Sequence, residues 1–271
     1  MALSPDFPTS PYAILDPKIR WYPGAEADQA EIGKLIPPLV QKIREGVHEW
    51  RAAGYPGISQ TSYSLLRHWF LEDHISMSPD GEINFQYYFA QREAVETAIW
   101  LFEHEEAKTP SSLIGYTSID SISPGMFEEN WTRYVFKLAT GVGKTKVLSL
   151  LIAWSYFHKL YEKDSDLSTN FLLIAPNIIV LERLKEDFNS LKIFSADPVI
   201  PENGFDGKNW KNDFNVTLHI QDEIGTVSPI GNIFLTNIHR IFEGKQAPAN
   251  TDENLTDFFL GHKPVSRTNE I

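Results

Sequence analysis

A glycine loop between an apolar stretch and a helical stretch constrains this chain more than any other feature. Residues 139–145 read Ala-Thr-Gly-Val-Gly-Lys-Thr, after the strand-like residues 134–138 and before the helix-like residues 147–157. Glycine lets the backbone turn its N–H groups toward a polyphosphate, and the new helix adds partial positive charge. In such a loop Lys144 can reach the phosphates and the Thr145 hydroxyl can ligate Mg²⁺. The predicted nucleotide-binding residues are Thr140, Gly141, Val142, Gly143, Lys144 and Thr145.

The composition is that of an ordinary globular protein, with 42% apolar and 22% charged residues in 271. The chain has no cysteine, which excludes disulfides, thiolate metal sites and cysteine nucleophiles. Its N-terminus lacks the basic and apolar segments of a signal peptide. The longest apolar run, residues 147–157, is too short to cross a bilayer. We therefore expect a cytoplasmic protein with no membrane partner.

Negative charge is concentrated in the first half of the chain. Residues 1–130 carry 9 basic and 19 acidic side chains and residues 131–271 carry 15 and 17, so net charges of −10 and −2 make up the total of −12. Nucleic-acid-binding surfaces are usually basic. The first half is therefore not expected to be the main contact with DNA, although main-chain N–H groups can hold phosphates without basic side chains.

The N-terminal part of the chain has helical periodicity. Residues 27–51 carry one apolar stripe, which Pro37 and Pro38 interrupt, so a second helix should begin near Pro38. Thr61 or Ser62 is expected to cap a short helix that runs to residue 70. A further helix is expected over about 87–105, followed by a polar linker.

The C-terminal part alternates strands with helices. Residues 171–174, 216–220 and 233–235 read as strands, and residues 178–188 read as a helix. Repeated strand-then-helix order predicts an α/β fold with a parallel sheet covered by helices. We expect a helical N-terminal region over residues 1–125 and a partial nucleotide-binding domain over 126–271.

The residue pattern of the glycine loop distinguishes classes of phosphate-loop protein. Kinases and GTPases usually have glycine five positions before the glycine of Gly-Lys-Thr, where this chain has Leu138. The form Ala-Thr-Gly-x-Gly-Lys-Thr resembles motif I of superfamily 2 helicases of the DEAD/DEAH type. That resemblance implies an incomplete RecA-like parallel sheet, ATP and Mg²⁺ as cofactors, and catalytic roles for Lys144 and Thr145, with Thr145 on the metal.

Three other segments lie where this resemblance places motifs. Gln91 looks like the glutamine that reads the adenine edge, and residues 175–177 and 236–237 look like two strand-end motifs that hold one nucleic-acid strand. Each segment also has a purely structural interpretation, as a solvated helix position, a turn or a helix cap. The predicted nucleic-acid contacts are Ala175, Pro176, Asn177, Thr236 and Asn237.

Within the superfamily, the chain resembles the restriction subunits of type III restriction-modification systems. Residues 91–101, 131–154 and 171–184 carry this likeness. It implies an ATP-dependent DNA helicase or translocase in a restriction system, with DNA and a modification methyltransferase subunit as partners.

The motif II carboxylates of that family, Asp-Glu-x-His, have no good match after the loop. Asp222 and Glu223 follow an alternating rather than a buried strand, and Asp252 and Glu253 lie in a polar stretch. We therefore expect the N-terminal fragment of a larger motor, with a gap in its sheet and unpaired strand edges. Such a chain should bind nucleotide weakly and hydrolyse none.

Two other functions remain open. One is a phosphate-loop enzyme outside the helicases, such as a kinase, for which DNA would not affect turnover. The other is a non-catalytic interaction module derived from a motor, which would fold but fail to bind ATP–Mg²⁺.

Overall fold

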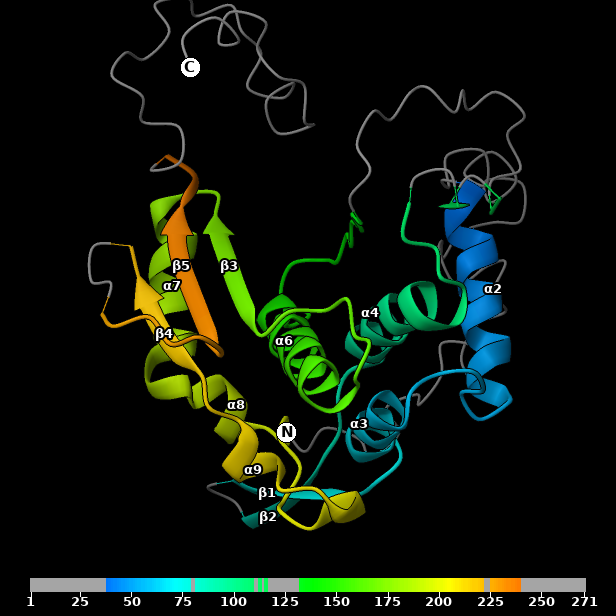
Figure 1. The fold of residues 1–271 in the computed structure, drawn as a ribbon, viewed down its shortest axis with the longest axis horizontal. Helices are drawn as coiled ribbons and strands as arrows, with labels where there is room; N and C mark the ends of the chain where they lie inside the picture. Colours follow the sequence, from blue (N-terminus) through cyan, green and yellow to red (C-terminus); the bar gives the residue numbers. More distant parts are fainter. Residues whose placement is uncertain are drawn as a thin grey trace, which may run out of the picture.

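The computed structural model describes residues 38–78, 81–109, 112–113, 115–116, 132–221 and 225–239. In Figure 1, the sheet and α7 lie on one side of α6, and α2, α3 and α4 lie on the other side. The elements are α2 Pro38–Ala52, α3 Gln60–Phe70, β1 His74–Ser78, β2 Gly81–Phe85, α4 Phe89–Ile99, the π-helix η3 Trp100–His104, α6 Lys144–Tyr161, β3 Asn170–Ala175, α7 Ile178–Phe188, η5 Asn189–Leu191, α8 Lys192–Ala196, η6 Phe205–Gly207, α9 Trp210–Asp213, β4 Thr217–Ile220 and β5 Asn232–Asn237.

The helices begin where local signals place them, with one exception. α2 begins at Pro38, as predicted, because proline fits the first turn of a helix. The expected cap of α3 at Thr61 or Ser62 is wrong. Ser59 is the N-cap, and its hydroxyl accepts from the Ser62 N–H at 3.1 Å. Thr61 lies within the first turn of α3, where it donates to Glu162.

α6 is the central helix and packs against both α3 and α4. Trp154 of α6 donates from its indole N–H to the Ser62 hydroxyl at 2.8 Å and to Glu103 at 3.1 Å. Burial alone would raise the pKa of Glu103, but hydrogen bonds from His158, Ser62 and the Ser59 N–H lower it. The carboxylate thus stays ionised at the junction of α3, η3 and α6.

The predicted α/β fold with a parallel sheet is confirmed. β5 lies between β3 and β4 and is parallel to both, with Asn170 opposite Asn232 and Ala175 opposite Asn237. Leu173 and Ala175 of β3 are buried on one face, and α7 packs against β3 and β5. On the other face, Leu172 and Ile174 are 58% and 46% exposed.

The strand predicted at residues 134–138 is not a strand, and this expectation is corrected. Tyr134, Phe136 and Leu138 are half-buried against the core while Val135 is 87% exposed, so the strand-like alternation is present. A strand also needs a hydrogen-bonding neighbour. Within the described part of the chain, no strand pairs with this segment, and β3 pairs on one edge only. The expected gap in the sheet stays a prediction.

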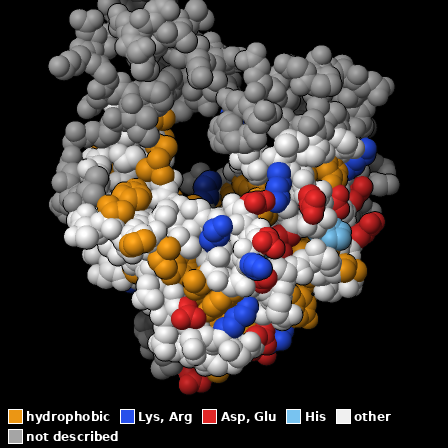
Figure 2. Space-filling model, in the orientation of Figure 1, with side chains coloured by type: hydrophobic (Ala, Val, Ile, Leu, Met, Phe, Trp, Pro, Cys, Tyr) orange, Lys and Arg blue, Asp and Glu red, His pale blue; other side chains and the backbone are white. Residues whose placement is uncertain are grey.

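Some expectations fall outside the described residues. These are the first helix before Pro38, most of the polar linker, and the two acidic pairs at 222–223 and 252–253. Among the described helices, none is both long and apolar enough to cross a membrane. Figure 2 shows hydrophobic side chains gathered over the sheet half of the molecule, whereas acidic and basic side chains interleave over the helical half.

A buried ionic cluster fixes α2 to α4. The Glu96 side chain is fully buried, and it accepts from Arg51 Nε at 2.8 Å, Arg92 Nε at 2.8 Å and the Tyr55 hydroxyl at 2.5 Å. Burial and the negative charge of Glu96 raise the pKa of Tyr55, which keeps its hydroxyl as a donor. Two guanidinium groups thus share one carboxylate in the C-terminal half of α4.

Replacing Glu96 with glutamine should destabilise the protein by about 3 kcal/mol or more, because two buried guanidinium groups would lose their counter-charge. The measurement is the free energy of unfolding in urea. Glu182→Gln is the matched control, since Glu182 pairs with Lys185 on the exposed surface of α7. It should cost less than about 0.5 kcal/mol. Equal losses in the two variants would contradict the assigned role of Glu96.

Candidate nucleotide-binding site

The glycine loop has the backbone conformation that its sequence predicts. Gly141 and Gly143 have φ values of 85° and 76°, in the left-handed region that favours glycine. Gly143 is the N-cap of α6, so the first amide groups of that helix face the loop. Successive backbone N–H groups at a helix start form a concave site for anions. The backbone conformation of the loop is therefore one that suits an anion such as phosphate.

Gln91 holds the loop from the neighbouring helix. Its side-chain N–H₂ donates to the Val142 carbonyl at 2.8 Å, and its Oε1 accepts from the Tyr88 N–H at 2.9 Å. The residue is 1% exposed. A Cβ atom at Gly143 would lie 2.4 Å from Gln91 Nε2. Glycine at 143 is thus required by its φ, and it also leaves room for the Gln91 side chain.

The adenine contact predicted for Gln91 stays a prediction. Both ends of its carboxamide already bind protein groups, and its side chain is buried. What the structure describes is a residue that positions the loop. The partners Tyr88 and Val142 had no signal in the sequence, because main-chain groups of any residue can donate or accept.

Lys144 and Thr145 begin α6, which places them at the positive end of the helix. The exposed Lys144 ammonium donates to the Ala139 carbonyl at 2.8 Å, so it lies folded back over the loop. A phosphate oxygen would be a stronger acceptor for this cation than a neutral carbonyl. The Thr145 hydroxyl hydrogen-bonds to no described group, which leaves it available as a ligand for Mg²⁺.

No acidic cluster supplements Thr145 in the described part of the chain. Among those residues, no group of three or more His, Cys, Asp or Glu side chains is placed to hold a metal ion. Mg²⁺ is usually bound by one or two carboxylates together with substrate phosphates and water. Thr145 and a bound polyphosphate would supply part of such a set, and the motif II candidates lie outside the described residues.

The segment that enters the loop is anchored although it is not a strand. The Tyr134 hydroxyl donates to the Ala107 carbonyl at 3.0 Å, just beyond η3. Burial raises the pKa of Tyr134 to about 12, so the hydroxyl remains a donor at neutral pH. On the other side of the loop, Lys146 forms an ion pair with Asp197. The loop is thus held from both flanks.

The predicted nucleic-acid contacts meet at one edge of the sheet. Ala175 lies opposite Asn237 and Ile174 opposite Thr236 in the parallel register, so the two strand ends are adjacent. Asn177 caps α7 by accepting from the Val180 N–H at 2.9 Å, and Asn237 accepts from the His239 N–H at 2.9 Å. Both side chains therefore serve as caps. Pro176, which lies between the last residue of β3 and Asn177, is exposed.

The comparisons with known proteins gave one result. A family model described as "Type III restriction enzyme, res subunit" matches residues 84–260. No curated protein and no solved structure shows a significant match. The matched span includes Gln91, the glycine loop and both strand ends.

Replacing Gln91 with methionine should loosen the loop, because the Val142 carbonyl and the Tyr88 N–H would both lose their partner. We expect faster amide hydrogen exchange in peptides covering residues 140–146. Peptides from α7 in the same sample give the internal reference. The variant Gln60→Met, at an exposed position of α3, controls for the change of side chain. Unchanged exchange at 140–146 would mean that Gln91 does not position the loop.

Proposed function

Because the chain belongs to the family of type III restriction enzyme res subunits, we propose that it is the ATP-binding part of a DNA helicase or translocase. In the full-length protein, ATP hydrolysis would be coupled to movement on DNA. The observation that carries the proposal is the loop itself. Two glycines with left-handed backbone lie at the start of α6, and Gln91 holds Val142 in place. We also propose that the protein acts in the cytoplasm, beside a modification methyltransferase subunit.

The loop residues have separate roles in this proposal. The N–H groups at the start of α6 cradle the phosphates, Lys144 exchanges the Ala139 carbonyl for a phosphate oxygen, and Thr145 ligates Mg²⁺. The lysine charge would matter most as charge develops on the transferring phosphoryl group. Bound ATP would supply the remaining oxygen ligands of the metal.

DNA would be held mainly through main-chain groups at the adjacent ends of β3 and β5. Basic and acidic side chains interleave on the face shown in Figure 2, and the chain carries a net charge of −12. The chain therefore lacks the broad basic surface that usually binds the DNA backbone. The start of α7, capped by Asn177, instead presents N–H groups and partial positive charge to a phosphate.

The complete motor would require further strands. The unpaired segment at residues 134–138 and the free edge of β3 support the proposal that strands with the motif II carboxylates lie between them in the full-length protein. Those strands would pair with the edge of β3 and bring the carboxylates to the Mg²⁺ site.

Replacing Lys144 with alanine should weaken binding of ATP–Mg²⁺ to this chain about 10- to 100-fold, because a charge-assisted hydrogen bond to phosphate is lost. Isothermal titration calorimetry measures the effect. Lys163→Ala, in the exposed loop after α6, is the control and should bind like the parent chain. In a full-length protein the same Lys144→Ala change should abolish ATP turnover. Near-normal ATPase activity in that full-length variant would contradict the phosphate-binding role assigned to Lys144.

The 271-residue chain should bind ATP but hydrolyse none, with or without DNA, since no motif II carboxylates were identified in its sequence. A phosphate-release assay with and without duplex DNA tests this. DNA-stimulated ATPase activity from the chain would overturn the expectation, and Asp222 and Glu223 would then be the residues to mutate. Absence of any ATP–Mg²⁺ binding by the folded chain would favour a non-catalytic interaction module.

A further inference from the structure

One face of the parallel sheet carries exposed apolar side chains. Leu172 and Ile174 lie on the face opposite α7, and both are exposed, so no described element covers this part of the sheet. Phe234 pairs with Leu172 in the parallel register, so it lies on the same face, where it is half-buried. Figure 2 shows hydrophobic side chains gathered over this half of the molecule. Parallel sheets occur almost only with both faces covered, so this face needs a cover.

The order of the strands indicates which segment supplies the cover. From β3 the chain passes along α7 and crosses β5 to reach β4. In Figure 1, α7 lies on one face of the sheet, which is the face of the buried Leu173 and Ala175. Crossover connections between parallel strands have the same hand in almost all proteins. A connection that runs in the opposite direction must therefore pass over the opposite face, that of Leu172 and Ile174.

The return from β4 to β5 follows this rule. The side chain of Asn232 lies on the same face as that of Phe234, because side chains alternate along a strand. Ser228, in the connection, donates from its N–H to Asn232 Oδ1 at 3.1 Å, and its carbonyl accepts from Asn232 Nδ2 at 2.7 Å. The described end of this return connection thus lies against the face of Leu172.

The segment after β5 carries apolar residues suited to this face. Residues 240–271 follow β5 and lie outside the described residues. Leu255, Phe258 and Phe259 have the i, i+3, i+4 spacing of one helix face, and in sequence they lie between Asp252 and Gly261, which are helix start and stop signals. The intervening residues 240–254 can span roughly 50 Å when extended. Neighbouring strands are about 4.8 Å apart, so this length is ample to return over the sheet.

We propose that the apolar stripe of Leu255, Phe258 and Phe259 packs on the sheet face formed by Leu172, Ile174 and Phe234. The proposal rests on the proposed function, because the direction of the return assumes that the next strand of the motor pairs with the free edge of β3. The occupant is then a segment of the same chain rather than a second molecule. The nucleotide-binding domain would have helices on both faces of its sheet.

Paired cysteines test this contact directly, because the chain has no cysteine of its own. In the 271-residue chain, Ile174→Cys combined with Phe259→Cys should be joined within one molecule by a short bis-maleimide reagent. Peptide mass spectrometry identifies the linked residues. Glu186→Cys combined with Phe259→Cys is the matched control and should give no link, since Glu186 is exposed on α7, which covers the other face.

Two further substitutions test the apolar stripe. Adding Phe258→Asn to the Ile174→Cys/Phe259→Cys chain should abolish the link, because it removes an apolar ring from the stripe. Asp257→Asn should leave the link unchanged, since at helical spacing residue 257 lies away from the stripe. Cooperative unfolding of each variant in urea verifies that the chain is folded.

The other outcomes overturn the proposal. A link between two molecules of the single variant Ile174→Cys would show that a second copy occupies the face. No link within the chain, or an equal link in the Glu186 pair, would show that the segment does not lie there. Calorimetry with ATP–Mg²⁺ on the same chains separates the two proposals. ATP binding without the link leaves the proposed function standing, whereas the link without ATP binding leaves only the placement of the segment.

Discussion

One buried carboxamide connects the two parts of the candidate site. Gln91 joins the start of α4 to the start of α6 through two hydrogen bonds, to the Tyr88 N–H and the Val142 carbonyl. The oxygen of an amide only accepts hydrogen bonds and its nitrogen only donates them, so this contact fixes the direction as well as the distance between the helices. Glycine at 143 permits the contact, because any side chain there would meet Gln91. Loop shape is therefore set by a residue that is about 50 positions away in the sequence.

The rest of the helical half supports this connection. α4 carries Gln91 in its first turn. Further along the same helix, Glu96 accepts hydrogen bonds from Arg51, Arg92 and Tyr55. α6 is held in turn by Trp154, which reaches Ser62 and Glu103. Rigid support of this kind keeps a binding site within the narrow tolerance that phosphate recognition needs.

Local signals in the sequence predicted the elements they control. Pro38 marks the start of α2, and the predicted bounds of the helix at residues 178–188 match those of α7, although the cap by Asn177 was not predicted. Non-local features were missed. The segment at 134–138 has strand periodicity, but a strand depends on a neighbour that its own residues do not specify.

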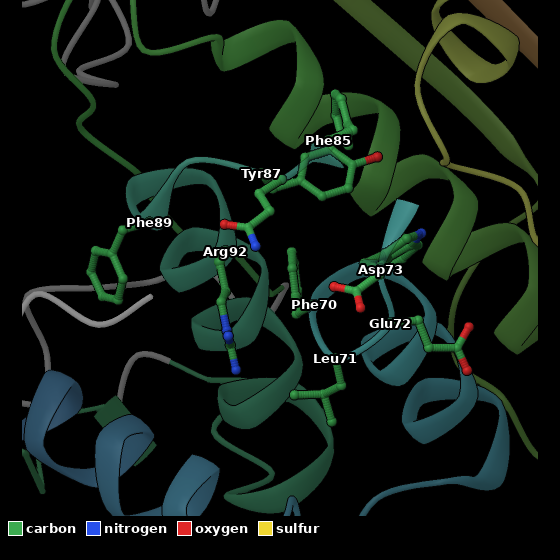
Figure 3. A pocket seen from close by; sticks show the side chains of 10 residues that line it. Phe70, Leu71, Glu72, Asp73, Phe85, Tyr87, Phe89 and Arg92 are labelled. Carbon is green, nitrogen blue, oxygen red and sulfur yellow. The ribbon is translucent and has the colours of Figure 1, made fainter. Parts of the chain in front are cut away.

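A small pocket beside the start of α4 (Figure 3) could not have been predicted from the sequence for a similar reason. Its walls come from the end of α3, the end of β2 and the start of α4, and aromatic residues at such positions are ordinarily core. The hairpin of β1 and β2, which carries Phe85, was not predicted either. In contrast, the glycine loop was predicted from sequence because its backbone requires glycine at fixed positions, a constraint that is visible in the residues themselves.

The free edge of β3 has a consequence for how this chain behaves in solution. No described strand pairs with this edge, so its N–H and C=O groups, beside the exposed Leu172 and Ile174, form a template on which a strand from another molecule can add. Proteins usually protect such edges with lysine, proline or a bulge, and β3 has none of these in Asn-Phe-Leu-Leu-Ile-Ala. At high concentration the isolated chain is therefore prone to aggregate through β3, and a charged substitution at Leu172 would act as a gatekeeper against it.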